Sequence, residues 1–397
     1  MKTTYKFRAY PSQVHKSTLN HQMHLSKQLY NLLLEKSQEH FKDYGKTFTK
    51  FDMNKWITQL KRKSPEFNEL HSQVCQNVAD RVSNGYKQFF RRIKERETGK
   101  KVRAGFPRFK SFVSSLTFPQ EGGFVIGKKK VRLSKIGNIN FVNHRDIEGI
   151  PKTCAIKKTK TDEWYLTIST EKDDIVPFTN GKGAVGMDLG IKKYAVLSDG
   201  SVLQNTHMSV KERSKLKRLQ RVISRRKKGS RKRRKAVIAF ARKYEHISKI
   251  KDDRLHKLSH RLVNSYSFIA YEELEIANMM GNHRLARSIG EESWGKFTDY
   301  LRYKAESAGC AVVSVDPRNT SKTCSDCGNI QYISLSERTF ACNKCGMSKD
   351  RDLNASVNIL NRATSGQGGS NASGDNARPL AREAVVKERG TIIGDSR

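Results

Sequence analysis

The spacing of apolar residues divides the first half of the chain into a helical part and a strand-rich part. Residues 3–9 alternate polar and apolar side chains, which predicts a short strand. Residues 19–33 and a second segment that opens at Ser64 carry apolar residues at helical spacing, which predicts a small helical unit. Residues 105–172 contain short β-like runs and a hairpin that turns at Asp162, and they predict a small β-barrel or sheet.

The second half of the chain reads as strands that alternate with helices. Residues 184–204 show three apolar runs separated by tight turns, one of them an Asp-Gly turn, which predicts an antiparallel meander. Residues 267–274 and 310–317 predict a fourth and a fifth strand with a helix before the fifth, and residues 352–363 predict a last helix. The tail from residue 364 is rich in Gly, Ser and Asn, so we expect it to be disordered. The expected fold class is α+β with several domains.

The charge of the chain is strongly unbalanced. Its 397 residues include 77 Lys and Arg against 39 Asp and Glu, a formal net charge of +38. Such a surplus indicates a polyanionic partner, and nucleic acid fits best. No apolar run approaches the ~18 residues of a spanning helix, and the N-terminus lacks the apolar core of a secretion signal. We therefore expect a cytoplasmic protein without membrane contact, in a compartment where structural disulfides are rare.

Carboxylates stand in or at the end of two apolar strands. Asp188 lies in an otherwise apolar run, where a buried and unpaired carboxylate is costly. It either starts a tight turn with Gly190 or serves a function. Glu272 closes the fourth strand, although Glu273 and Glu275 beside it leave open which of the acids points inward.

A third acidic position lies at the start of the last helix. Asp350 and Asp352 both stand there, and one of them is expected to be an ordinary N-cap. Acids on the first strand of a meander, at the end of a fourth strand and at the start of a terminal helix resemble the RNase H-like fold of RuvC-type nucleases. Carboxylates are the oxygen ligands that Mg²⁺ prefers, and two ions about 4 Å apart promote phosphodiester hydrolysis. Gly186 and Gly190 beside Asp188 would let a phosphate approach the strand backbone.

Two cysteine pairs lie between the fifth strand and the last helix. Cys324-x2-Cys327 and Cys342-x2-Cys345, with 14 residues between the pairs, have the spacing of a four-thiolate zinc ribbon. A disulfide would need an oxidising compartment that the sequence does not indicate, and a redox CxxC would not need a second pair. We expect one structural Zn²⁺ with no open position for catalysis.

Residues 211–243 form the most basic segment, with 17 basic residues and one acid around a break at Gly229 and Ser230. A charge run is often only a solvated face, but this one is the main candidate for contact with RNA or a heteroduplex. Trp164 and Tyr165 are candidates for base stacking, with the hydrophobic core as the alternative. The candidate nucleic-acid-binding residues of the basic segment are Lys217, Arg218, Arg221, Arg225, Arg226, Arg231, Arg233 and Arg234.

Longer motifs resemble one family along most of the chain. They resemble the successive motifs of the transposon-encoded TnpB proteins, which are small relatives of type V CRISPR effectors. The similar segments are YPSQ, GFPRFKS, GMDLGIKKYAV, YEELEIANM, SWGKFTDYLRYKAESAG, VDPRNTSKTCSDCG and KDRDLNASVNIL. The resemblance implies that Asp188, Glu272 and Asp352 are the catalytic, Mg²⁺-binding acids, the last because the ligand stands two residues before Asn354. The chain has Glu-Glu where the family usually has Glu-Asp, which makes Glu273 a conceivable substitute for Glu272.

The resemblance also implies a function. It implies an RNA-guided DNA endonuclease that binds a noncoding guide RNA, cuts double-stranded DNA beside a short transposon-associated motif, and acts as a monomer. Two other functions stay open: a DNA-strand-joining transposase, which an RNase H-like triad also serves, and a binding-only regulator, against which the intact acids argue. The implied domains are a wedge-like β-barrel (1–10 and 105–178), an inserted helical recognition lobe (11–104), a RuvC-like nuclease (179–317 and 348–363) and a zinc ribbon (318–347).

Overall fold

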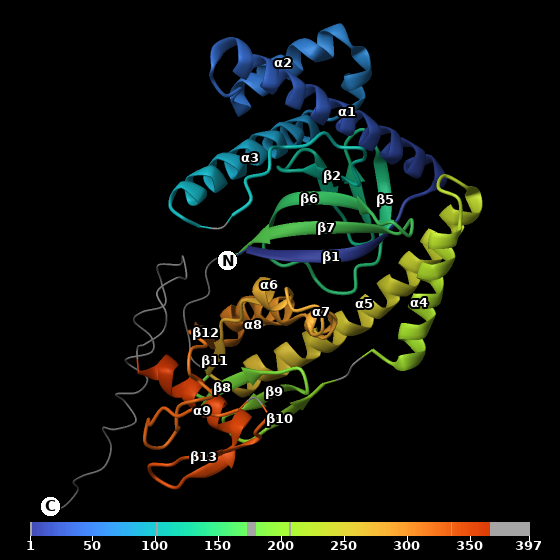
Figure 1. Ribbon diagram of the computed structural model, residues 1–397. Coiled ribbons are helices and arrows are strands. Elements are labelled where there is room, and N and C mark those ends of the chain that lie inside the picture. The colour runs from blue at the N-terminus through green and yellow to red at the C-terminus, as the bar shows by residue number, and fades with distance from the viewer. Residues whose placement is uncertain (1, 101, 173–179, 206–207, 335, 366–397) are drawn as a thin grey trace, which may run out of the picture. The chain divides into compact units, whose positions relative to one another are not determined.

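The chain folds into two compact units, residues 1–174 and residues 175–397, each with its own hydrophobic core. Figure 1 shows the computed structural model, which describes residues 2–100, 102–172, 180–205, 208–334 and 336–365. Disorder was expected from residue 364, but Thr364 is the last residue of a helix; the tail from residue 366 lies outside the described residues. Throughout the described ranges, no helix combines the length and the apolar character needed to cross a membrane.

The first unit is built on a seven-stranded antiparallel sheet (Figure 1). Its strands are β1 (Lys2–Tyr10), β2 (Ser115–Phe118), β3 (Phe124–Ile126), β4 (Lys130–Leu133), β5 (Gly137–Phe141), β6 (Ile150–Lys158) and β7 (Trp164–Glu171). They pair in the order β2-β6-β7-β1-β5-β4-β3, so the N-terminal strand lies in the middle of a sheet whose other strands come much later in the chain. Strands β2 and β3 end this order, and the expected closure into a barrel is not seen among the described residues.

Side chains alternate along these strands between a buried and a more exposed face. In β7, Trp164, Leu166 and Ile168 are buried and the residues between them are partly exposed. The β6-β7 hairpin turns at Asp162 as predicted, where a φ of 67° is a left-handed conformation that Asp tolerates. Trp164 therefore belongs to the core of the first unit, and the prediction that it stacks on bases is wrong.

Helices of the first unit form a small helical part that packs on this sheet. They are α1 (Gln13–Tyr44), α2 (Lys50–Lys63), the 3-10 helix η1 (Pro65–Glu69) and α3 (Ser72–Glu97). The helical segment predicted to open at Ser64 begins as a 3-10 helix with Ser64 at its N-cap, and the α-helix itself begins only at Ser72. The spacing of apolar residues did not predict helix α2, because this helix buries only Met53 and Ile57. A capping box between Thr49 and Asp52 defines its start.

The second unit contains a five-stranded sheet (Figure 1). Its strands are β8 (Ala184–Leu189), β9 (Lys193–Leu197), β10 (Val202–Gln204), β11 (Phe268–Glu272) and β12 (Ala311–Val315). They pair in the order β10-β9-β8-β11-β12. The first three form the predicted antiparallel meander, whereas β11 runs parallel to both β8 and β12.

Helices cover both faces of the second sheet. They are α4 (Val210–Arg225), α5 (Arg231–Ser265), α6 (Ile276–Met279), α7 (Ala286–Glu292), α8 (Trp294–Ala308) and α9 (Arg351–Thr364). Met187 and Tyr271 point to one face and join a core with residues of α5 and α8. Ala270 points to the other face and packs against Ile359 of α9. Helices α6 and α7 were not predicted, because four and seven residues are too few to reveal a helical period.

Candidate functional site

Asp188 and Glu272 lie side by side at the ends of two neighbouring strands. Met187 of β8 pairs with Tyr271 of β11 in a parallel ladder, so the next residue of each strand stands at the same level. Paired residues in a parallel ladder point to the same face of the sheet, and successive residues alternate between the two faces. Met187 and Tyr271 point toward α5 and α8, so the residues that follow them point to the opposite face. The Asp188 and Glu272 side chains therefore project toward α9.

Gly186 sets the distance between β8 and α9. A Cβ atom on Gly186 would lie 2.0 Å from the carbonyl oxygen of Ser356 and 2.8 Å from the amide nitrogen of Leu360. Only a glycine lets the helix backbone lie directly on the strand at this point. We expected Gly186 to make room for a phosphate, and that interpretation is wrong, because α9 occupies the space.

This contact brings Asp352 level with Asp188. Asp352 lies one helical turn before Ser356, and Asp188 lies two strand residues after Gly186; these steps advance about 6 Å and about 6.7 Å along their elements. Because α9 also contacts β11, all three acidic positions border the same space.

The three acids influence one another electrostatically. The pKa of Asp188 is raised well above its usual value, first by burial and then by the negative charges of Glu272 and Asp352. The pKa of Glu272 is also raised, by burial, against the opposing effects of a hydrogen bond from Thr320 and the charge of Arg362. Without a cation, this part of the sheet therefore holds an excess of negative charge that disfavours the ionised form of Asp188.

Burial separates Glu272 from the acids beside it. The Glu272 side chain is 9% exposed, whereas Glu273 and Glu275 are exposed to solvent. The hydroxyl of Thr320, in the loop after β12, donates a hydrogen bond to Glu272 Oε1. Of the three adjacent acids, Glu272 is the one that faces α9.

Asp350 and Asp352 have different roles at the start of α9. Asp350 is the N-cap and accepts hydrogen bonds from the backbone N–H groups of Asp352 (2.9 Å) and Leu353 (3.2 Å). It also pairs with Lys193, at 3.2 Å. Burial would raise the pKa of Asp350, but these interactions lower it. The carboxylates of Asp188 and Asp352, by contrast, have no hydrogen-bond or ion-pair partner among the residues that the structure describes.

Buried asparagines of α9 attach the loop that leads to the first cysteine pair. Asn358 donates hydrogen bonds to the carbonyl oxygens of Thr320 (2.8 Å) and Thr323 (2.6 Å). Asn354 donates to Thr323 O at 2.8 Å and accepts from the N–H of Ser325 at 2.9 Å. The same loop thus contacts Glu272, α9 and the cysteine cluster.

The four cysteines form a second cluster. The Sγ atoms of Cys324 and Cys345 are 3.7 Å apart, and those of Cys327 and Cys342 are 3.6 Å apart. Four thiolates arranged tetrahedrally at 2.3 Å from one ion are separated by about 3.8 Å, so the cluster has the dimensions of a zinc site. The N–H groups of Cys345 and Lys344 lower the pKa of Cys342, which favours the thiolate that binds a metal.

Local turns build this cysteine cluster. Gly328 and Gly346, one after each pair, have φ values of 72° and 73°, and their N–H groups bond back to the carbonyl oxygens of Cys324 (3.0 Å) and Cys342 (3.1 Å). Strands β13 (Thr339–Ala341) and β14 (Ser348–Asp350) flank the second turn and end directly at α9. The cluster is therefore a C-terminal zinc-ribbon type of module.

The acids form a looser donor set than the cysteines. Within the described residues, only the four cysteines form a group of three or more His, Cys, Asp or Glu whose ligand atoms all lie within 4.8 Å of one another. A pair of ions about 4 Å apart shares its ligands between two centres, so each ion takes only some of the carboxylates. An all-oxygen set with two unpartnered carboxylates fits Mg²⁺, the hard cation expected from the sequence.

The basic segment forms a helical hairpin of α4 and α5, which pack against each other. Helix α4 contains no buried residue. Of the eight candidate residues, seven are exposed and Arg233 is partly exposed; none forms an ion pair within the described part of the chain. Their charges are therefore available to an external polyanion.

Fold and side-chain clusters together define an α+β multidomain protein with a four-cysteine cluster of the zinc-ribbon type. Two family models match the chain. Residues 167–283 match the OrfB_IS605 model, described as "Probable transposase", and residues 294–359 match "Cas12f1-like, TNB domain".

Individual relatives agree with these matches. "Putative RNA-guided DNA endonuclease InsQ" of Escherichia coli (strain K12) is 28% identical over 352 residues, 84% of this chain and 85% of the relative. "Putative RNA-guided DNA endonuclease" of Streptomyces pristinaespiralis is 28% identical over 389 residues, 96% of this chain and 92% of the relative. "TnpB-like protein L79" of Acanthamoeba polyphaga mimivirus is 30% identical over 226 residues, 53% of this chain and 43% of the relative. The chain is thus similar to TnpB-type proteins in both segments: residues 167–283 resemble the OrfB_IS605 family and residues 294–359 a Cas12f1-like TNB domain.

Proposed function

We propose that this chain is an RNA-guided DNA endonuclease that cuts target DNA next to a short transposon-associated motif. The observation that carries the proposal is the position of Asp188, Glu272 and Asp352 on the α9 side of one sheet, where the other two acids raise the pKa of Asp188. The names of the relatives in Escherichia coli and Streptomyces pristinaespiralis support the same activity.

Cleavage would take place in an RNase H-like, RuvC-like site in which Asp188, Glu272 and Asp352 hold two Mg²⁺ ions. When bound, the ions supply an activated water and stabilise the charge on the leaving oxygen. The charges of both other acids raise the pKa of Asp188, so Asp188 would help to hold the ions together with each of them. Because the pKa of the Asp188 carboxyl group is raised, its ionised form, which would bind the cations, is favoured only at higher pH than for an ordinary Asp, so we expect cleavage to rise with pH.

The nucleic acid would lie along the basic surface of the second unit. We assign the guide RNA or its heteroduplex with DNA to the α4-α5 hairpin, where none of the eight candidate Lys and Arg residues forms an ion pair in the described structure. In the first unit, β1 pairs with both β5 and β7, which supports residues 11–104 as a recognition lobe inserted into a wedge domain of residues 1–10 and 105–178. We place the nuclease at 179–317 and 348–363 and the zinc ribbon at 318–347.

Purification of the full chain with its copurifying RNA provides the test. We expect this complex to cut a DNA duplex that matches the RNA, in the presence of Mg²⁺, once the adjacent motif has been found by screening a library of flanking sequences. Asp188→Ala and Asp352→Ala abolish cutting and keep RNA binding, whereas Glu273→Gln, an exposed neighbour of Glu272, cuts normally. Undiminished cutting by both alanine variants would remove these acids from the mechanism.

A DNA-strand-joining transposase is the second candidate, because the description of the OrfB_IS605 model names that activity. The same acids would serve it. Joining of DNA strands without any RNA would establish the transposase in place of the nuclease. RNA-dependent occupancy of DNA without cutting would instead indicate a binding-only regulator.

A further inference from the structure

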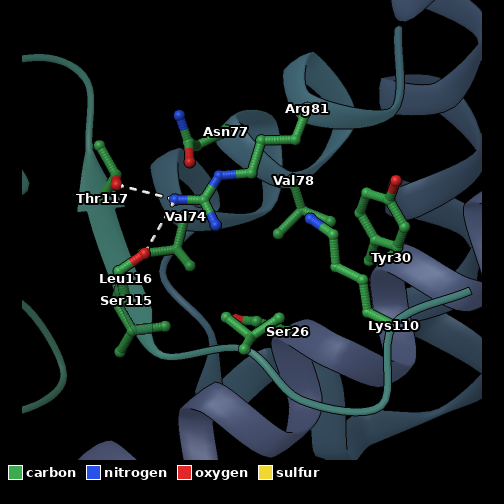
Figure 2. Close-up of a pocket in the computed structure, with 11 residues that line it drawn as sticks. Ser26, Tyr30, Val74, Asn77, Val78, Arg81, Lys110, Ser115, Leu116 and Thr117 are labelled. Carbon is green, nitrogen blue, oxygen red and sulfur yellow. Dashed lines mark hydrogen bonds between the residues drawn. The ribbon is translucent and has the colours of Figure 1, made fainter. Parts of the chain in front are cut away.

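Two cationic side chains line a small pocket in the first unit (Figure 2). Arg81 comes from α3 and Lys110 from the segment before β2, and both point into the pocket. Residues lining it also include Ser26 and Tyr30 of α1 and the hydroxyl residues Ser115 and Thr117 at β2. The pocket thus lies where the helical part of the unit meets the edge strand of its sheet.

Neither cation has an acidic partner among the described residues. Burial lowers the pKa of Arg81 with no acid opposing it. Burial also lowers the pKa of Lys110, and the positive charge of Arg81 adds to this effect. The nearest acid along α3, Asp80, is paired with Lys50 at 2.5 Å. Two repelling cations held in a partly buried pocket without a counter-charge disfavour the fold by themselves.

The pocket nevertheless holds both cations in place. Arg81 Nη2 donates hydrogen bonds to Thr117 Oγ1 (3.0 Å) and Ser115 Oγ (3.4 Å). The Asn31 side chain clamps the Lys110 backbone, accepting from its N–H at 2.8 Å and donating to its carbonyl oxygen at 3.0 Å. Lys110 Nζ lies 3.8 Å from the centroid of the Tyr30 ring. Because these contacts hold two positive charges in one pocket, the pocket is suited to bind an anion.

A hydroxyl group inside the pocket is also without a partner. Ser26 is 2% exposed, and its Oγ makes no hydrogen bond in the described structure. The free volume beside it is about 10 Å³, room for one oxygen atom the size of a water. A whole phosphate does not fit inside, but one of its oxygen atoms does when the remainder lies at the mouth.

We propose that Arg81, Lys110 and Ser26 form a binding site for one backbone phosphate of a nucleic acid, with one phosphate oxygen inserted between the two cations. Charge-assisted hydrogen bonds from the fixed guanidinium and ammonium groups position the strand without reading its sequence. This site depends on the proposed function in one respect, because both take nucleic acid as the ligand. It is separate from cleavage, and it adds a contact in the first unit to those expected of the α4-α5 hairpin.

The test measures binding in the absence of Mg²⁺, so that a failure of cleavage chemistry does not affect it. Full-length Lys110→Met and Arg81→Gln are compared with wild type for binding of a mixed-sequence RNA, a DNA duplex of the same length and inorganic phosphate, over a range of salt concentrations. We expect each variant to lose about tenfold in affinity for the nucleic acid that uses the site. The slope of log affinity against log salt should fall by about 1. Lys87→Gln, an exposed lysine of α3, is the matched control and should leave affinity nearly unchanged.

Thermal stability distinguishes this site from a purely structural pair of cations. Lys110→Met keeps the aliphatic stem over Tyr30 and removes one of two repelling charges, so its melting temperature should equal or exceed that of wild type.

Normal RNA and DNA affinity in both variants would overturn the proposal. If inorganic phosphate stabilised wild type more than the variants while nucleic-acid affinity stayed unchanged, the pocket would be a site for a free anion only, which also overturns it. Loss of RNA affinity alone or of DNA affinity alone identifies the strand that is held.

Discussion

The cysteine cluster and the acidic cluster of the second unit are both sets of metal ligands, but they are assembled in different ways. The cysteines lie close together in the chain, and two glycine turns bring their sulfur atoms within 4.8 Å of one another. The acids come from β8, β11 and α9 and meet only because these elements pack together. Packing buries Asp188 and also brings like charges beside it, and burial first and these charges second raise its pKa.

This difference predicts opposite effects on stability when one ligand is removed from each cluster. Asp188→Asn should reduce cleavage by more than the about 100-fold typical of changes beside a metal site. The metal-free variant should also melt at a higher temperature near neutral pH. Because the pKa of Asp188 is raised in the folded state, the folded protein binds more protons than the unfolded chain at pH values above the ordinary pKa of Asp. Ionisation of Asp188 therefore lowers the stability of the fold as the pH rises. The Asn side chain does not ionise, so the variant lacks this effect. Melting curves with and without Mg²⁺ check this, and a lower melting temperature without Mg²⁺ would contradict it.

Cys324→Ser should instead destabilise the protein. Structural zinc contributes about 10 kcal/mol to the folding of small zinc modules, so the ribbon should unfold when one thiolate is lost. We expect one zinc ion per chain in wild type and a marked decrease in the variant, measured by elemental analysis. Cleavage should fall as well, because Ser325 is hydrogen-bonded to Asn354 of α9, two residues after Asp352. Normal zinc content and melting in the variant would show that the cysteines do not form the site.

The contact between α9 and β8 can be tested without changing any ligand. Gly186→Ala places a Cβ atom 2.0 Å from Ser356 O, so α9 must shift, at a cost of about 1–3 kcal/mol. Because a displacement of about 1 Å can lower catalysis by up to about 100-fold, we expect reduced cleavage with RNA binding intact. Gly183→Ala, in open space just before the same strand, is the control and should behave like wild type. Equal cleavage by both variants would disprove that this contact positions Asp352.

Thr320 should have the smallest effect. Thr320→Val removes the hydrogen bond that lowers the pKa of Glu272, so that pKa should rise further. We expect cleavage to fall about tenfold, a typical loss for a residue that orients a ligand, and the pH profile to shift toward higher pH. Ser should restore both, since it keeps the hydroxyl. A fall in activity with an unchanged pH profile would indicate that Thr320 acts on packing and not on Glu272.

Local features of the fold could be predicted from the sequence. The meander of β8 to β10, the hairpin turning at Asp162 and the break between α4 and α5 follow from apolar spacing and turn residues. Helix α2 could not be predicted in this way, because its two buried residues are too few to produce a periodic pattern.

The acidic cluster was only partly predictable. The strand pattern alone did not distinguish Glu272 from Glu273 and Glu275; the family resemblance favoured Glu272, and burial now distinguishes it. The residue pattern alone did not separate Asp350 from Asp352 either; the resemblance favoured Asp352, and the cap and the ion pair with Lys193 now account for Asp350. No sequence signal indicated the paired cations of Arg81 and Lys110, because neither lies in a charge run and they meet only across the packing of α3 on β2.

By itself, the sequence of this protein determined the composition of its sites: four thiolates at fixed spacing, carboxylates at the ends of strands and a large positive charge. These depend on residue type and on neighbours a few positions away. Only the tertiary structure decided that α9 lies on Gly186, that Thr320 holds Glu272 and that two cations share one pocket, because those contacts join residues far apart in the chain. Their geometry depends on how elements pack, which residue spacing does not encode.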